Sequence, residues 1–135
     1  MELPTNLLIT RGCILHSTIF EYINHGKFFV IIGEDENSFV GLFFINSGIN
    51  AFNHKNHLLQ MQFLLTPSDY TFLSHNSYLS CTALTKIDKQ KLANSINTGQ
   101  TEYKGQLLST HLNKIMILVR ESKLFSRKEK ETYFK

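Results

Sequence analysis

The stretch Lys27-Phe-Phe-Val-Ile-Ile-Gly-Glu-Asp-Glu-Asn-Ser-Phe-Val-Gly-Leu-Phe-Phe-Ile45 decides the fold class of this chain. Residues 27–32 and 39–45 are short apolar runs rich in β-branched and aromatic side chains, which favours strands over helices. The acidic segment 33–38 between them has a length that suits a hairpin connection. The sequence therefore predicts two antiparallel strands joined by an acidic turn.

Further strand signals flank this hairpin on both sides. Residues 12–20 form a β-branched and apolar run before it, and a polar loop ending at Gly26 separates the two. After the hairpin, residues 58–65 alternate apolar side chains with Gln60 and Gln62, as a half-buried strand does. Residues 70–73 and 77–84 complete the set, so about five or six short strands are expected.

The pattern then changes from strands to helices. Asp88 can cap a short helix that runs to Ile96. A longer helix follows Gly105, because four apolar residues recur there at helical spacing: Leu108, Leu112, Ile115 and Val119. We therefore expect a mainly β fold with added helices: one domain over residues 1–135, with a small β-barrel at about 11–84, a helical part at about 86–125 and a charged tail at 126–135.

The composition predicts a folded core. Apolar residues make up 42% of the 135 residues, which excludes a disordered chain. The chain has eleven Phe and no Trp, and most of these rings should be buried. Phe-rich surface patches that form a homodimer are the alternative for part of them.

The cysteines and the lengths of the apolar runs indicate the cellular compartment. Cys13 and Cys81 lie in strand-like runs without metal-ligand spacing, so buried reduced thiols are expected. The opening residues lack the pattern of a secretory signal, and no apolar run approaches the roughly 18 residues of a membrane span. We expect a cytoplasmic protein without a membrane partner.

Charge is distributed unevenly along the chain. Residues 1–84 carry three basic and six acidic side chains, whereas residues 85–135 carry eleven basic and five acidic ones. This asymmetry indicates either an anionic partner for the basic part or attraction between the two parts. A solvated basic helix and tail is the alternative.

Motifs for metal and nucleotide chemistry are absent from the sequence. His54 and His57 have ligand-like spacing but no nearby carboxylate, and HExxH, the phosphate-binding loop GxxxxGK[ST], GxGxxG and GxSxG are missing. His111 lies on the apolar helix stripe, where a packed histidine at the edge of the core is expected. We therefore predict no metal and no cofactor.

The segments that flank the hairpin carry the remaining candidate chemistry. Lys27 opens a strand and could stabilise a phosphate or its transition state. Ser47 ends a strand and could donate a hydrogen bond to a phosphate oxygen, and His25 could exchange protons near neutral pH. Ordinary solvated turn residues are the competing interpretation.

The order of these segments resembles the MazF/PemK-like toxins of bacterial toxin–antitoxin systems, over roughly residues 11–120. Five segments carry the resemblance: Gly12-Cys-Ile14, the loop with Glu21 followed by Gly26-Lys-Phe-Phe-Val30, Phe44-Ile-Asn-Ser47, Ser77–Asp88, and Gly105-Gln-Leu107. Lys27-Phe28 stands where the family has an Arg-Pro pair.

The resemblance implies an SH3-like barrel with a C-terminal helix and metal-independent cleavage of single-stranded RNA. Lys27 and Ser47 would be catalytic, and Glu21, His25 and Asn46 would bind substrate. An antitoxin protein would be a further partner. Because Lys lacks the bidentate fork of Arg, a non-catalytic barrel module that binds nucleic acid or a protein is the alternative function.

Overall fold

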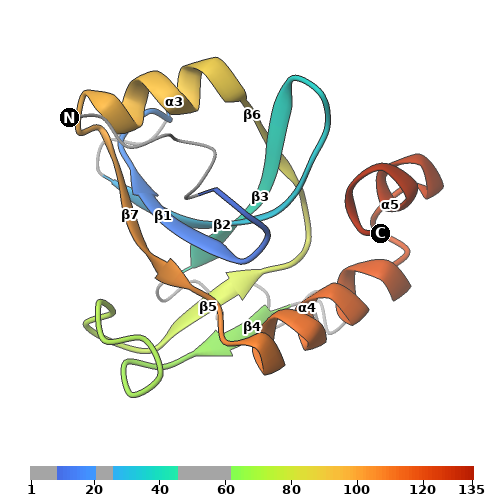
Figure 1. Cartoon of the computed structure of the whole chain (residues 1–135). Helices are drawn as coiled ribbons and strands as arrows, with labels where there is room; N and C mark the ends of the chain where they lie inside the picture. The colour runs from blue at the N-terminus through green and yellow to red at the C-terminus, as the bar shows by residue number, and fades with distance from the viewer. Residues whose placement is uncertain (1–8, 21–25, 46–61) are drawn as a thin grey trace.

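Figure 1 shows a curled sheet of strands flanked by helices. The structure is a computed structural model, and it describes residues 9–20, 26–45 and 62–135. The strands are β1 (Cys13–Ser17), β2 (Lys27–Glu34), β3 (Ser38–Ile45), β4 (Gln62–Leu65), β5 (Ser77–Ser80), β6 (Thr85–Asp88) and β7 (Thr101–Gln106). The helices are α3 (Lys89–Asn97), α4 (Ser109–Glu121) and α5 (Arg127–Tyr133). The prediction of a mainly β, barrel-like fold followed by helices is confirmed.

The sheet is antiparallel and follows the order β4-β5-β3-β2-β1-β7. The long strand β3 pairs with β6 through residues 38–41 and with β5 through residues 44–45. β3 bends as it passes from one neighbour to the other, and register shifts in the β1–β7 and β2–β3 pairings add to the curvature. The sheet therefore curls into the barrel-like shape in Figure 1.

The predicted hairpin is present as β2 and β3, with a tighter turn than the sequence suggested. Asp35 N–H donates to the Ser38 carbonyl, and Asp35 Oδ1 accepts from the backbone N–H groups of Asn37 and Ser38. These bonds let the strands extend to Glu34 and Ser38, inside the segment predicted as loop. An Asx-type turn explains this difference.

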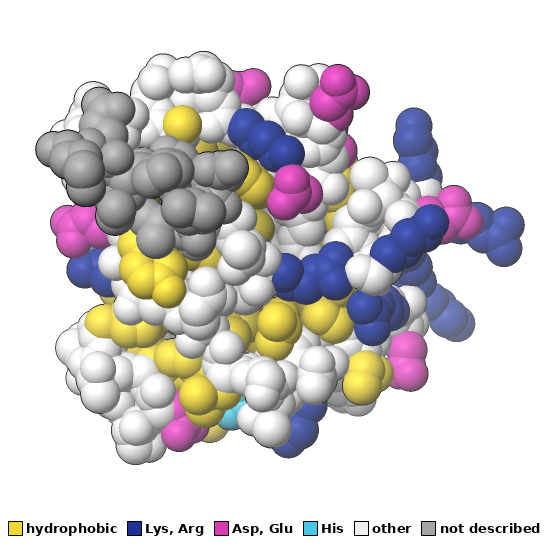
Figure 2. Space-filling model, in the orientation of Figure 1, with side chains coloured by type: hydrophobic (Ala, Val, Ile, Leu, Met, Phe, Trp, Pro, Cys, Tyr) yellow, Lys and Arg dark blue, Asp and Glu magenta, His cyan; other side chains and the backbone are white. Residues whose placement is uncertain are grey.

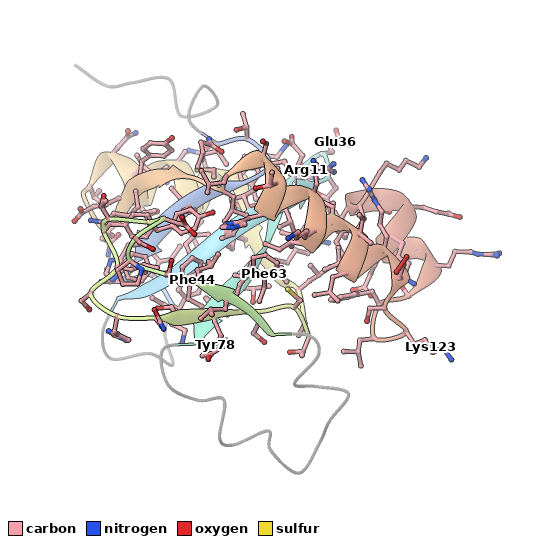
Figure 3. The ribbon with its side chains drawn as sticks, turned by 90° about the horizontal axis from the view of Figure 1, so that it is seen from below. Arg11, Glu36, Phe44, Phe63, Tyr78 and Lys123 are labelled. Carbon is pink, nitrogen blue, oxygen red and sulfur yellow. The ribbon has the colours of Figure 1, made fainter. Side chains whose placement is uncertain are left out.

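Side chains of the hairpin alternate between two apolar cores on opposite faces of the sheet. Val30 and Ile32 join the core that α4 covers, whereas Phe29 and Ile31 join the core next to α3. Burial on both faces explains why the run is continuously apolar rather than alternating. In Figure 3, Phe44 lies at the centre of the sheet among the interior side chains.

Several strand and helix predictions need correction. Residues 70–73 form turns rather than a strand, although Tyr70 and Leu73 are buried. Strands β6 and β7 were not expected, because the first has one buried side chain and the second lies at the end of the sheet order. Leu108 is exposed at the N-terminal boundary of α4 instead of lying on its buried stripe.

The segment predicted only as a charged tail forms α5 and packs onto the barrel. Ser126 and Glu129 make a capping box at its start. Tyr133 and Phe134 are buried in the core under α4. Arg11 donates to the carbonyl oxygens of Ile32, Tyr133 and Lys135 and so ties the first strand region to the end of α5.

Docking of α5 also depends on Asp35 at the tip of the hairpin. The Tyr133 hydroxyl donates to Asp35 Oδ2 over 2.9 Å, and Lys86 Nζ lies 3.4 Å from the same oxygen. The Tyr133 hydroxyl is the main cause that lowers the pKa of Asp35 to about 2. Since the unfolded value is near 4, this carboxylate stabilises the fold above about pH 4 and the contribution is lost as pH falls through about 2.

We therefore expect Asp35→Asn to reduce the difference between the melting temperatures measured at pH 5 and pH 2. The variant keeps an oxygen acceptor for Tyr133 but has no titrating group. Thermal unfolding followed by circular dichroism would measure this, with Glu36→Gln, an exposed neighbour, as the control. An unchanged pH dependence in Asp35→Asn would contradict the role of this contact.

Candidate functional site

Lys27 is the predicted site residue that the structure describes. Glu21, His25, Asn46 and Ser47 lie outside the described residues. Their proximity to Lys27 therefore stays a prediction. The surroundings of Lys27 can be built from the strands on which they lie.

Lys27 is the first residue of β2 and pairs in register with Ser17, the last residue of β1. Its side chain is half-buried, and Nζ lies 5.9 Å from the centroid of the Phe43 ring. The ion pairs of the described residues do not include Lys27. Lys27 is thus a cation at the end of a strand, held against an aromatic ring.

An aromatic cluster lies beside this cation. The Phe20 ring packs edge-to-face on Phe29 at 5.4 Å and on Phe43 at 4.9 Å between ring centroids. Phe29 and Phe20 are buried, and Phe43 is half-buried. The cluster belongs to the core next to α3 and supports the Lys27 end of the sheet.

Two neighbouring hollows open between the end of β1 and helix α3, and Phe20 of the aromatic cluster lines one of them. One has a volume of about 460 Å³ and the other about 590 Å³, and both are lined by Ile19, Asp88 and Lys91. Asp88 caps α3, because its side chain accepts from the Lys91 backbone N–H. Sequence reasoning missed these hollows, since helix α3 and the β1 end meet only in the folded chain.

A chain of buried hydroxyl groups lies behind the β1 end. Thr101 Oγ1 lies 2.6 Å from Ser17 Oγ and 2.7 Å from Ser95 Oγ, and Ser95 donates to the Leu92 carbonyl. Ser17 Oγ also accepts from the Ile19 N–H. Because every hydroxyl has partners, the chain joins β1, β7 and α3 and serves structure.

Two described histidines, His16 and His111, make their contacts away from the Lys27 side chain. His16 pairs with Phe28 and contacts its ring, so it projects from the opposite face of the sheet to Lys27. His111 Nδ1 lies 2.7 Å from the Tyr70 hydroxyl, which accepts from the Leu108 N–H. As predicted, His111 is a half-buried residue at the edge of the core.

The cysteines are buried free thiols, as expected from the sequence. Burial raises the pKa of Cys13 and of Cys81 to about 12, so neither is a ready nucleophile near neutral pH. Among the described residues, no group of three or more His, Cys, Asp or Glu side chains could hold a metal ion. Within the same residues, no helix combines the length and apolar character that crossing a bilayer requires.

Comparison with known proteins adds no family assignment to this geometry. No protein-family model matches the chain, and a search of curated proteins gave no match. The resemblance to the MazF/PemK-like toxins therefore stays a prediction that rests on the order of short sequence segments and leads to the proposal below.

Proposed function

We propose that this protein is a toxin-like barrel that cleaves single-stranded RNA without a metal ion, with Lys27 at the centre of its site. The observation that carries the proposal is the position of Lys27. It is a cation at the end of β2, without an ion-pair partner in the described residues, against an aromatic cluster of which one ring, Phe20, lines a hollow of about 460 Å³. A cation in this position can stabilise the negative charge of a phosphate, whereas a cation in a structural salt bridge is already paired.

The chemistry follows from the substrate. The 2′-hydroxyl of RNA attacks the adjacent phosphorus, a new P–O2′ bond forms, and the bond from phosphorus to the 5′ oxygen breaks. The 2′-hydroxyl gives up its proton, and the leaving 5′ oxygen takes one up. Lys27 would stabilise the negative charge that gathers on the phosphate oxygens, Ser47 would position the phosphate, and Glu21, His25 and Asn46 would contact the substrate.

The experiment is a cleavage assay on purified protein with single-stranded RNA in the presence of a chelator. We expect fragments that end in a 2′,3′-cyclic phosphate and a 5′-hydroxyl. DNA of the same base sequence is the matched control, since it lacks the attacking hydroxyl. Intact RNA after prolonged incubation with pure folded protein would overturn the proposal of catalysis.

The second candidate is a non-catalytic barrel that binds nucleic acid or a protein. Phe28, which stands where the family has Pro, favours this candidate because it is half-buried and packs against the core under α4. Its ring contacts His16, Phe44 and Phe72. A barrel in which this position serves packing can bind a ligand without catalysing a reaction.

Protein partners belong to the proposal as well. An antitoxin would cover the end of the sheet at which Lys27 lies. A homodimer stays a prediction, and light scattering would test it by measuring the oligomeric state. The described Phe side chains are all buried or half-buried. For these residues, Phe-rich surface patches therefore give no support to a dimer.

A further inference from the structure

A second basic region lies at the corner between α4 and α5. A hollow of about 450 Å³ opens there, and its lining includes four cationic residues, Arg120, Arg127, Lys130 and Lys135. We call these four residues the α4–α5 basic surface. Figure 2 shows Lys and Arg side chains gathered on this side of the molecule, and Figure 3 places Lys123 at the same end.

The backbone that carries this surface is held firmly. Arg120 Nε donates to the Phe134 carbonyl, which joins α4 to the end of α5. Phe134 is buried against Phe125, with 5.3 Å between ring centroids. Because these contacts order the backbone under the cations, binding an anion does not require folding of this region.

Acidic side chains neutralise this surface only in part. The ion pairs of the described residues all lie elsewhere, on Lys86, Lys89 and Lys104. Glu131 is the carboxylate in the lining of the hollow, and Glu129, which makes the capping box of α5, adds a second negative charge on the same helix. The four cations outnumber these two carboxylates, so the region keeps a net positive charge.

This surface is distinct from the Lys27 region. Helices α4 and α5 pack on the face of the sheet that holds Val30 and Phe44, whereas Lys27 lies against Phe43 on the face next to α3. A ligand on the α4–α5 basic surface would therefore leave the proposed cleavage site open.

We propose that the α4–α5 basic surface binds the phosphate backbone of single-stranded nucleic acid. It offers charged side chains from two helices, which suits repeated phosphates. None of its residues lies on a strand edge that could pair with an extended peptide. The inference concerns binding only and holds whether or not the protein cleaves RNA.

The test measures binding of a fluorescent oligothymidylate of about 20 nucleotides, longer than a typical single-strand site. This probe lacks 2′-hydroxyl groups, so the proposed cleavage reaction cannot consume it. The variant Arg127→Gln/Lys130→Gln removes two cations without touching the capping box or Arg120. A thermal melt would verify that the variant is folded.

When the logarithm of the binding constant is plotted against the logarithm of the salt concentration, each phosphate contact on a single strand makes the line steeper by about 0.7. That slope corresponds to about fivefold in affinity between 1 M and 0.1 M salt. The double variant should therefore bind about 25-fold more weakly at 0.1 M salt, with a salt slope smaller by about 1.4.

The control is Lys89→Gln/Lys104→Gln, which removes the same charge from the start of α3 and from β7, outside the lining of this hollow. An equal loss of affinity in both variants, or none in Arg127→Gln/Lys130→Gln, would overturn the inference. So would binding of polyglutamate in place of the oligonucleotide, which would indicate an acidic protein partner. RNA binding without cleavage would leave the inference standing and reject only catalysis.

Discussion

Replacing Lys27 by methionine should lower the rate of metal-independent RNA cleavage by about 100- to 1000-fold, the range seen when one charge-stabilising donor is lost. Methionine keeps an unbranched stem that can lie over Phe43, where the Lys27 ammonium group now lies 5.9 Å from the ring centroid. The change therefore removes charge with little loss of packing. Single-turnover cleavage measured at saturating enzyme separates this effect from weaker binding.

Two controls sharpen this prediction. Lys27→Arg keeps the charge and adds a bidentate donor for phosphate, so its cleavage rate should equal or exceed that of the wild-type protein. Lys104→Met removes a charge from β7, where Lys104 pairs with Glu102, and should leave the rate unchanged. Full activity in Lys27→Met would exclude Lys27 from catalysis.

Replacing Gly33 by alanine should lower the free energy of unfolding by about 3 kcal/mol, at the upper end of the usual cost of overpacking. A Cβ at Gly33 would lie 2.5 Å from the Tyr133 carbonyl oxygen and 2.9 Å from Tyr133 Cβ. The first contact is with backbone, so it cannot be relieved by a side-chain rotation. The strain should be released by undocking α5, which exposes Tyr133 and Phe134.

Urea denaturation would measure the loss of stability, and limited trypsin digestion would locate it. Cleavage after Arg127, Lys128 or Lys130 should become faster in Gly33→Ala, because a docked helix resists the protease. Glu36→Ala, on the same hairpin but exposed, should change the stability by less than about 0.5 kcal/mol. Unchanged stability and digestion in Gly33→Ala would show that α5 does not pack on Gly33.

Undocking of α5 also gives a link between stability and the second binding surface. Arg127, Lys130 and Lys135 lie on or next to this helix, and Arg120 is tied to its last residues. Gly33→Ala should therefore weaken oligothymidylate binding as well. Its cleavage rate should change less, since Lys27 lies on the other face of the sheet.

Short-range patterns accounted for much of the strand and helix order. The β2–β3 hairpin could be predicted because strands that are buried on both faces have continuous apolar runs. Asp88 could be predicted as a helix cap because Asp side chains accept from the N–H groups of the first turn, and its carboxylate does accept from the Lys91 N–H. Ser126 and Glu129 carried an equally local signal for α5, the spacing of a capping box, which was missed within a charged tail.

Other elements were not readable from local pattern. β7 has one buried side chain, Thr101, and its position comes from backbone pairing with β1. Tyr70 and Leu73 are apolar because a turn packs under α4, not because they form a strand. In both cases the element that the segment packs or pairs with, β1 or α4, is distant in sequence, so the pattern within the segment cannot predict the contact.

By itself, the sequence determined the two continuous apolar runs of the hairpin, the buried thiols and an excess of positive charge in residues 85–135. Only the tertiary structure brought four cations together on the α4–α5 basic surface and placed Lys27 on the same face of the sheet as Phe43. Arg11 and Arg120 converge on the end of α5 because unpaired carbonyl oxygens there need donors. Side-chain identity is a local property, whereas the field at a surface depends on contacts made across the whole fold.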